Sequence, residues 1–400
     1  MIDDMARPTV SVVMATHQGA THLEAAVRSV LAQSHRDLEL ILVDDASTDA
    51  TPAIIRRMAE QDARVRPITL ATNVGAAAAR NATLDAARGD WIAIVDSDDA
   101  MHPARIERLI EAAEILAADM IADDMVHFGD PQTAGVTLLG DLGIDGTHAI
   151  SATALVTSDT AEAGRASMGY LKPVIRAARL KSLRYDKRLR VGEDFDLYLR
   201  LLLAGAAFHV VPDPTYLYRR HAGSLSHRLS SAAAAALVAA HGEAWNIARR
   251  TRPDDGPLDE AMAARDALLR RKLDYARLVE DLKARRPFAA TMRIARRPAL
   301  LADLRDSLSD RRQRRRTQSP GPTGAATETT VVLAPADCVT EIDAPPDAIR
   351  IPVSPMRAPT ARTGDSHVLL ARQLAELASR GPVRIVAEGV EGRHAAGYLP

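Results

Sequence analysis

Short apolar runs alternate with amphipathic segments through the first quarter of the chain. The apolar runs are rich in β-branched residues and predict buried strands at 10–15, 38–43, 65–70 and 91–95. Apolar residues at helical spacing predict intervening helices that begin near Leu23, Pro52 and Ala76. Thr21 and Glu24 have the spacing of a capping box for the first of these helices. This alternation predicts an α/β fold with a mostly parallel sheet and helices on both faces.

The pattern is less regular beyond residue 120. A strand near Asp123 and Asp124 is followed by a glycine-rich stretch that reaches Gly164 and predicts long loops. Order returns at 174–180, and an apolar helix follows Gly192. A strand is expected at 208–211, before two prolines.

The remaining chain divides by composition. Residues 229–316 predict a helical extension that becomes increasingly basic, and residues 317–366 form a linker rich in Pro, Thr and Ala. Two apolar runs in that linker, at 329–333 and 348–353, are strand candidates, and 367–400 resembles a short α/β tail of unknown role. We therefore expect four parts: 8–228, 229–316, 317–366 and 367–400.

Charge and cysteine content narrow the possible partners. A net charge of −1 with a pI near 6.9 gives no overall attraction to nucleic acid, which we do not expect as a partner. The single cysteine, Cys338, excludes an internal disulfide framework. The chain starts without a basic segment leading into an apolar one, and it has no apolar window of membrane-spanning length. We therefore expect a cytoplasmic protein.

Polar clusters follow three of the predicted strands. They are Thr16–His17, Asp44–Asp45 and the acidic group Asp96, Asp98 and Asp99. Ligands of open α/β sheets bind at the carboxyl ends of the strands, where these clusters lie. The three carboxylates repel one another, so either a bound cation or a solvated turn must relieve them. The sequence has neither G-x-G-x-x-G after the first strand nor a Walker-type phosphate loop.

Six motifs occur in a fixed order: VSVVMATHQ from Val10, VDDASTD from Val43, NVGAAAARN from Asn73, DSDD from Asp96, GED from Gly192 and YRRHAGSLS from Tyr218. In order and spacing they resemble family 2 glycosyltransferases, over residues 8–228. The resemblance implies the GT-A fold and an inverting transfer from a nucleotide-diphosphate sugar to a hydroxyl acceptor. Within the family, the chain is most similar to bacterial exopolysaccharide transferases of the succinoglycan type.

The resemblance also implies roles for individual residues. Asp194 matches the catalytic base, and Asp98 and His221 match metal contacts for Mg²⁺ or Mn²⁺. The donor-binding residues that it implies are Thr16, His17, Asp45, Arg80, Asp96 and Arg220. Each has a structural alternative: Asp45 as a turn residue, Arg80 on a solvated helix face, and Asp194 in an acidic helix N-terminus.

Partners and competing functions follow from the same residues. We expect a UDP-linked sugar as donor and a saccharide or lipid-linked saccharide as acceptor. The basic extension suits peripheral contact with the inner face of the cell membrane, or else a solvated face packed on the catalytic domain. A nucleotidyltransferase is the alternative enzyme, although residues 16–21 lack the basic residues that such a loop needs. A non-catalytic nucleotide-sugar-binding module is the second alternative.

Overall fold

A computed structural model of the chain describes residues 8–129, 133–160, 167–220, 229–305 and 307, and the strands at 329–335, 349–353 and 383–387. Within these residues the main sheet has nine strands, in the order β3-β2-β1-β4-β8-β6-β9-β5, with β7 paired to β9. The strands are β1 (Val10–Thr16), β2 (Leu38–Asp44), β3 (Val65–Thr69), β4 (Trp91–Ile94), β5 (Ala100–Met101), β6 (Met120–Phe128), β7 (His148–Ile150), β8 (Val174–Arg176) and β9 (Phe208–Arg219). The longest pairings, β1 with β2 and β6 with β9, are parallel.

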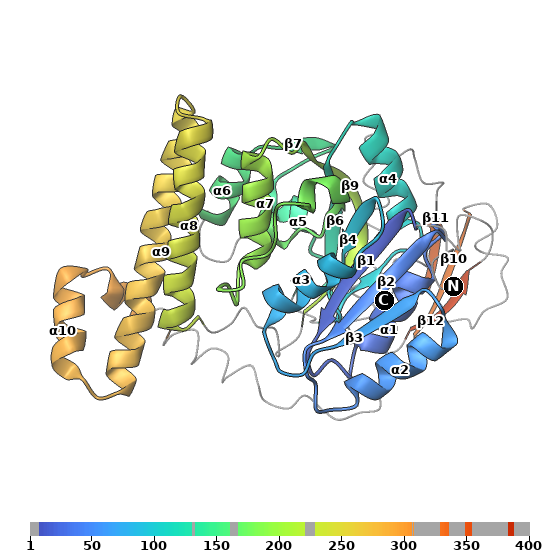
Figure 1. Cartoon of the computed structure of the whole chain (residues 1–400), viewed down its shortest axis with the longest axis horizontal. Helices are drawn as coiled ribbons and strands as arrows, with labels where there is room; N and C mark the ends of the chain where they lie inside the picture. Colours follow the sequence, from blue (N-terminus) through green and yellow to red (C-terminus); the bar gives the residue numbers. More distant parts are fainter. Residues whose placement is uncertain are drawn as a thin grey trace.

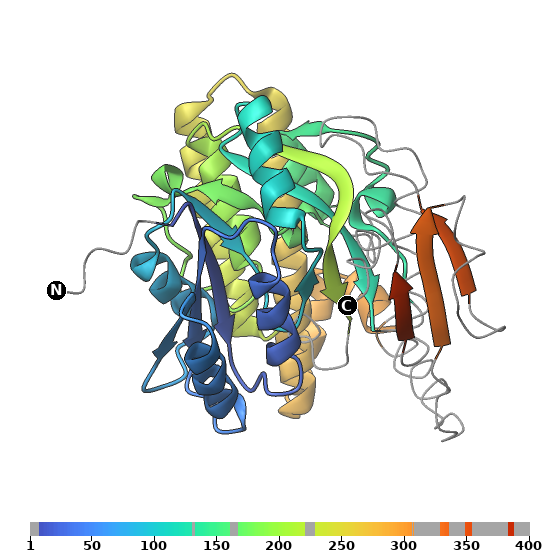
Figure 2. The ribbon, with the colours of Figure 1, turned by 90° about the vertical axis from the view of Figure 1, so that its right-hand side faces the viewer.

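Helices flank this sheet (Figures 1 and 2). They are α1 (Leu23–Leu31), α2 (Thr51–Gln61), α3 (Ala76–Ala86), α4 (Arg105–Ile115), α5 (Leu138–Leu142), α6 (Ala152–Thr160) and α7 (Glu193–Leu203). The apolar face predicted for α1 is buried, as are Ile54, Ile55 and Met58 of α2. The α/β prediction, with a mostly parallel sheet, is confirmed.

Several local predictions were wrong. His22 rather than Thr21 precedes α1, and no side chain caps that helix, so there is no capping box. The glycine-rich stretch contains α5, β7 and α6 as well as loops. The helices α5 and α6 are short, and β7 depends on distant pairing with β9. The dependence of β7 on its partner explains why local sequence did not predict that strand.

The strand expected at 208–211 continues as β9 to Arg219, through Pro212 and Pro214. The pairing of β6 with β9 matches Asp123 to Val211 and then Met125 to Tyr216. Residues 212–215 of β9 therefore lie opposite a single residue of β6. Such a bulge accommodates prolines, because its residues need not donate to the regular ladder.

The basic extension forms the helices α8 (Ser231–Thr251), α9 (Gly256–Lys283) and α10 (Pro287–Arg296). Figure 1 shows α8 and α9 side by side and α10 at the end of the molecule away from the sheet. No helix in the described part of the chain is both long enough and apolar enough to cross a membrane.

A second, parallel sheet has the order β11-β10-β12 and comprises β10 (Thr329–Pro335), β11 (Ile349–Val353) and β12 (Val383–Ala387). Strands from the predicted linker 317–366 thus pair with a strand from the predicted tail 367–400. The domain limits themselves stay predictions. Apart from β12, the predicted tail 367–400 lies outside the described residues.

Candidate active site

The carboxyl ends of three neighbouring strands form one edge of the sheet. Strand β1 pairs in parallel with both β2 and β4, so the residues that follow these strands lie near one another. The loops after β1 and β2 are joined, because the Gln18 side chain donates to Thr48 Oγ1 at 2.8 Å and its backbone N–H donates to Ser47 Oγ at 2.9 Å. The polar clusters predicted at strand ends therefore share one location.

Asp45 organises the loops after β1 and β2 at this edge. Its buried carboxylate accepts hydrogen bonds from the backbone N–H groups of Val74 (2.7 Å) and Gly75 (2.8 Å), which holds the loop before α3. His17 is exposed, and its Nδ1 lies 2.8 Å from the backbone oxygen of Asp45. The buried Oγ1 of Thr16 has no hydrogen-bond partner among the described residues. A buried hydroxyl without a partner is unfavourable and is suited to a ligand.

Five charged side chains from four parts of the chain meet beside this edge, and we call them the charged cluster: Arg80, Asp96, Lys172, Glu193 and Asp194. Arg80 on α3 donates to Asp96 Oδ1 at 2.7 Å and also to Glu193 on α7. The Lys172 ammonium lies 2.8 Å from Asp96 Oδ2 and 2.7 Å from Asp194 Oδ2. Arg80 is therefore a buried ion-pair partner, and the solvated-face alternative for it was wrong.

Burial and mutual attraction oppose each other in the charged cluster. Burial works against the charge of Asp96, but Lys172 and Arg80 outweigh it and hold the pKa of Asp96 well below its ordinary value. Burial likewise disfavours the Lys172 ammonium, yet Asp194 and Asp96 raise the pKa of Lys172. The ion pairs outweigh burial for both groups, so Asp96 and Lys172 are charged at neutral pH.

One oxygen of Asp194 stays unused within the described residues. Oδ2 accepts from Lys172, whereas the buried Oδ1 has no hydrogen-bond partner, and its ion-pair neighbour Arg80 Nη1 lies 3.5 Å away. A buried carboxylate oxygen that accepts no hydrogen bond is costly, and a group that binds there with an O–H would satisfy it. Asp194 also lies in the first turn of α7, where an acidic residue is favourable at a helix N-terminus. Its position therefore fits both the predicted role as base and the structural alternative.

The carboxylates of the acidic group after β4 differ in how deeply they are buried. Asp99 is buried and accepts from the Tyr216 hydroxyl (2.7 Å) and the backbone N–H of Arg219 (2.7 Å). Burial, together with the charges of Asp98 and Asp96, raises the pKa of Asp99 well above its ordinary value. Asp99 thus supports β9 through these hydrogen bonds, whereas Asp98 is half-buried.

The residues fit a divalent cation only in a limited way. Asp98 offers carboxylate oxygen, which suits Mg²⁺ or Mn²⁺. Asp96 accepts a hydrogen bond from Arg80, and Asp99 accepts one from Tyr216. No group of three or more metal-binding side chains occurs in the described part of the chain. A cation at Asp98 would therefore complete its coordination with substrate phosphate and water. His221 lies outside the described residues. The backbone N–H of Arg220 donates a hydrogen bond to the backbone oxygen of Phe128 at 2.8 Å.

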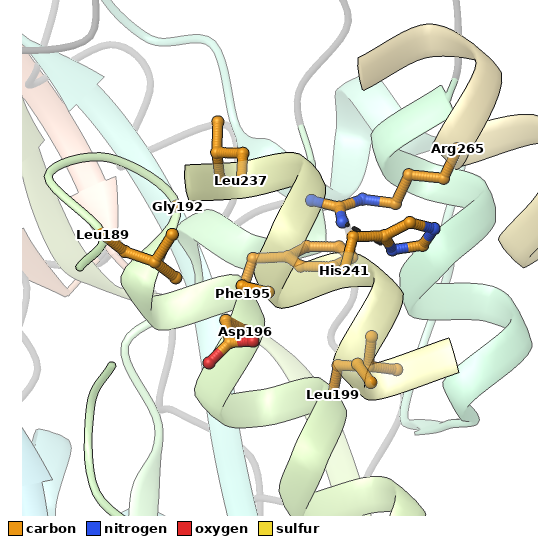
Figure 3. Close-up of a pocket in the computed structure, with 10 residues that line it drawn as sticks. Leu189, Gly192, Phe195, Asp196, Leu199, Leu237, His241 and Arg265 are labelled. Atoms are coloured by element: carbon orange, nitrogen blue, oxygen red, sulfur yellow. Dashed lines mark hydrogen bonds between the residues drawn. The ribbon is translucent and has the colours of Figure 1, made fainter. Parts of the chain in front are cut away.

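Two packing arrangements support the charged cluster from behind. The fully buried Arg105 binds Asp123 with two nitrogens and also donates to the backbone oxygen of Lys172, which fixes the position of that lysine. On the other side, Phe195, His241 and Arg265 point toward one another (Figure 3). The Arg265 guanidinium lies 3.8 Å from the centre of the Phe195 ring and 3.0 Å from His241 Nδ1. The helical extension thereby packs against the residue next to Asp194.

Sequence reasoning missed Lys172 and Glu193 as members of the charged cluster. Glu193 stood beside the predicted base, and Lys172 lay in a turn-rich segment without a motif. The available signal was the setting of Lys172, between Leu171 and the apolar run 173–175. A lysine among apolar residues is expected to be buried and therefore paired with carboxylates.

Similarity to known proteins agrees with this geometry. The family model described as "Glycosyl transferase family 2" matches residues 11–140. The succinoglycan biosynthesis protein ExoO of Rhizobium meliloti (strain 1021) is 32% identical over 307 residues, which cover 76% of this chain and 82% of that protein. The chain belongs to glycosyl transferase family 2. The family membership confirms the predicted glycosyltransferase and sets aside the nucleotidyltransferase alternative.

Other family 2 proteins support the same assignment. ExoU of Rhizobium meliloti (strain 1021), also named a succinoglycan biosynthesis protein, is 31% identical over 56% of this chain and 66% of its own length. The resemblance to succinoglycan-type transferases is therefore confirmed. Among solved structures, S. aureus TarS in complex with UDP has a TM-score of 0.50 at 18% identity, covering 64% of this chain and 70% of that one. This similarity confirms the GT-A fold.

Proposed function

We propose that this family 2 enzyme transfers a sugar, with inversion, from a nucleotide-diphosphate sugar to a hydroxyl acceptor in bacterial polysaccharide synthesis. The observation that supports this most directly is the buried Oδ1 of Asp194 within the charged cluster, which accepts no hydrogen bond among the described residues and lies 3.5 Å from Arg80 Nη1. The succinoglycan names of its relatives support the polysaccharide context. A single displacement needs one base on the acceptor side and no covalent enzyme nucleophile.

The donor lies along the edge formed by β1, β2 and β4. Asp45 accepts a hydrogen bond from the imide N–H of uracil, because a carboxylate has about four acceptor positions and two are used by Val74 and Gly75. Thr16 and His17 line the base pocket, and Asp96 accepts from the ribose hydroxyls. Arg80 and Arg220 provide positive charge to the diphosphate.

The transfer proceeds in one step. The acceptor oxygen attacks C1 of the donor sugar while the bond between C1 and the diphosphate oxygen breaks, and its electron pair leaves with the nucleotide diphosphate. The acceptor proton passes to Asp194 Oδ1. Asp98 and His221 would hold Mg²⁺ or Mn²⁺, which would supply positive charge for the leaving diphosphate.

A panel of nucleotide sugars tests this function. UDP-, GDP-, ADP-, CDP- and dTDP-sugars are assayed for metal-dependent protection against thermal unfolding and for metal-dependent hydrolysis. We expect a UDP-sugar to respond, and Asp98→Asn to weaken the metal-dependent part. Asp194→Asn should retain donor binding and lower transfer by about 10²–10⁴-fold. Near-wild-type transfer by Asp194→Asn would disprove the base assignment, and no response to any donor would count against the whole proposal.

We further propose that the acceptor is a lipid-linked saccharide and that α10 contacts the inner face of the membrane. Phe288 is 81% exposed and Met292, one helical turn later, is 40% exposed. Arg293 and Arg297 pair inward with Asp281 and Asp274 of α9, whereas three further arginines of this segment are exposed: Arg285, Arg286 and Arg296. No acidic residue occurs from 284 to 302. Exposed apolar residues among unopposed positive charges suit an anionic lipid surface.

Flotation of the full chain with lipid vesicles tests this contact. We expect binding to vesicles that contain phosphatidylglycerol and little binding to pure phosphatidylcholine. Phe288→Ser/Met292→Ser should lose the binding. Ile115→Ser, which removes a 61% exposed apolar residue from α4, should keep it. Equal flotation of the double variant and the wild type would refute a role for α10.

A further inference from the structure

Lys172 forms ion pairs with two carboxylates that have different proposed roles. Its ammonium bridges Asp96, assigned above to the ribose, and Asp194, assigned above as the base, at 2.8 and 2.7 Å. Its side chain is only 5% exposed, so water contributes little to the solvation of its charge. The ammonium therefore depends on nearby anions, and it will favour whichever anionic partners the site offers.

The backbone of Lys172 is fixed, whereas its side chain can change direction. Arg105 donates to its backbone oxygen, and Ile94 on β4 donates to the backbone oxygen of Pro173 at 3.4 Å. The ammonium is a point charge at the end of four methylene groups, and it binds phosphate oxygens without a fixed geometry. A small rotation of the stem would exchange one anionic partner for another and leave the sheet unchanged.

A bound donor changes the charges around Lys172. Its diphosphate adds negative charge next to Asp96, and its ribose hydroxyls satisfy oxygens of Asp96 that the two cations now satisfy. In the structure, Oδ2 of Asp194 accepts a hydrogen bond from Lys172 at 2.7 Å. A carboxylate in an ion pair with an ammonium is a weaker proton acceptor than one that has lost that partner.

We propose that Lys172 exchanges Asp194 for the diphosphate when a nucleotide sugar binds, so that the base is released only once the donor is in place. The inference rests on the proposed function and adds a donor-binding residue to it. Binding of the donor and release of Asp194 are then coupled, which favours donor binding before acceptor binding.

Nucleotide affinity tests the exchange without knowledge of the acceptor. UDP is titrated into the full chain by calorimetry in the presence of Mn²⁺. Lys172→Met should weaken UDP binding by about tenfold or more, because a phosphate partner is lost. Asp194→Asn should strengthen UDP binding by about five- to tenfold, because Lys172 no longer has to leave a carboxylate.

The double variant separates the exchange from simple loss of a negative charge. In a Lys172→Met background, Asp194→Asn should give no gain in UDP affinity. Asp196→Asn is the matched control, since Asp196 lies on the same helical turn but pairs with Arg200 at 2.6 Å, and it should leave UDP affinity unchanged. Lys172→Arg should keep part of the UDP affinity that Lys172→Met loses.

Three results would overturn the exchange. One is an unchanged or weakened UDP affinity in Asp194→Asn, and another is an equal gain from Asp194→Asn with and without Lys172. The third is the absence of binding by UDP, GDP, ADP, CDP and dTDP with either Mg²⁺ or Mn²⁺, which would refute the proposed function as well. The first two outcomes refute the exchange alone, because UDP binding itself is then observed.

Discussion

Replacing Arg105 with methionine is expected to destabilise the catalytic domain strongly. The Arg105 side chain is fully buried, and it binds Asp123 with three N–O contacts of 2.7, 2.9 and 3.1 Å. It also lies 4.8 Å from the centre of the Tyr216 ring. Methionine has a similar length but no charge, so Asp123 would keep only the Thr215 hydroxyl as a side-chain donor. Removing one member of a buried ion pair costs about 3–5 kcal/mol.

This loss is a large part of a typical stability of about 5–15 kcal/mol. Arg105→Met/Asp123→Asn removes both charges and should be less destabilised than the sum of the single variants, by about 1–3 kcal/mol. The exposed pair of Arg270 and Asp266 on α9 provides the control. Arg270→Met should leave the unfolding midpoint unchanged, because an exposed ion pair contributes little.

Urea unfolding followed by tryptophan fluorescence measures these differences. Trp91 lies buried in β4 and Trp245 lies on α8, so a Trp245→Phe background makes the signal specific for the sheet. We expect the midpoint to fall with an unchanged slope. A loss below about 1 kcal/mol in Arg105→Met, or strictly additive single variants, would refute the view that this pair supports the site.

Two further predictions concern single residues. Burial raises the pKa of Asp124 to about 7 despite hydrogen bonds from the backbone N–H groups of Leu139 and Met125. The folded state therefore holds this proton more tightly than the unfolded state. The free energy of unfolding should fall by about 3–5 kcal/mol as pH rises from 4 through 7. Asp124→Asn should abolish this pH dependence in urea titrations. An unchanged pH dependence in the variant would contradict its attribution to Asp124. Gly192 has φ 77°, and a Cβ there would lie 3.1 Å from Leu237 Cδ2. Gly192→Ala should therefore lower the free energy of unfolding by more than about 1 kcal/mol and slow transfer. Gly205→Ala (φ 84°, no atom within 4 Å) should show the backbone cost alone, and an equal effect of both variants on transfer would contradict a role for the Leu237 contact.

The sequence predicted the part of the fold that depends on local periodicity. Strands β1 to β4 and helices α1 to α3 each carry their own apolar pattern, and they lie within one or two residues of the predicted limits. Element β7 could not be predicted in this way, because its exposed His148 and Ala149 have no apolar alternation and pairing with β9 stabilises it. The bulge that accommodates Pro212 and Pro214 depends likewise on a partner strand.

The site was predictable where a residue follows a strand or belongs to a motif. Four residues met one or both conditions: Asp45, Arg80, Asp96 and Asp194. In the structure Arg80, Asp96 and Asp194 belong to the charged cluster. Lys172 met neither condition, since its carboxylate partners lie far away along the chain. The sequence also could not rank Asp98 and Asp99, because only the packing of Tyr216 shows which of them is buried.

The charged cluster also affects how the enzyme is made. Arg80 and Glu193 are separated by 113 positions in the chain, and Lys172 and Asp194 follow the region that the family model covers. A ribosome that has released only that region presents Arg80 and Asp96 without their later partners. Within the charged cluster, Arg80 and Asp96 can then pair with each other, while Lys172, Glu193 and Asp194 are still missing. The charged cluster can therefore form only after α7 has emerged, and premature termination before α7 would yield a domain that lacks Asp194, the proposed base.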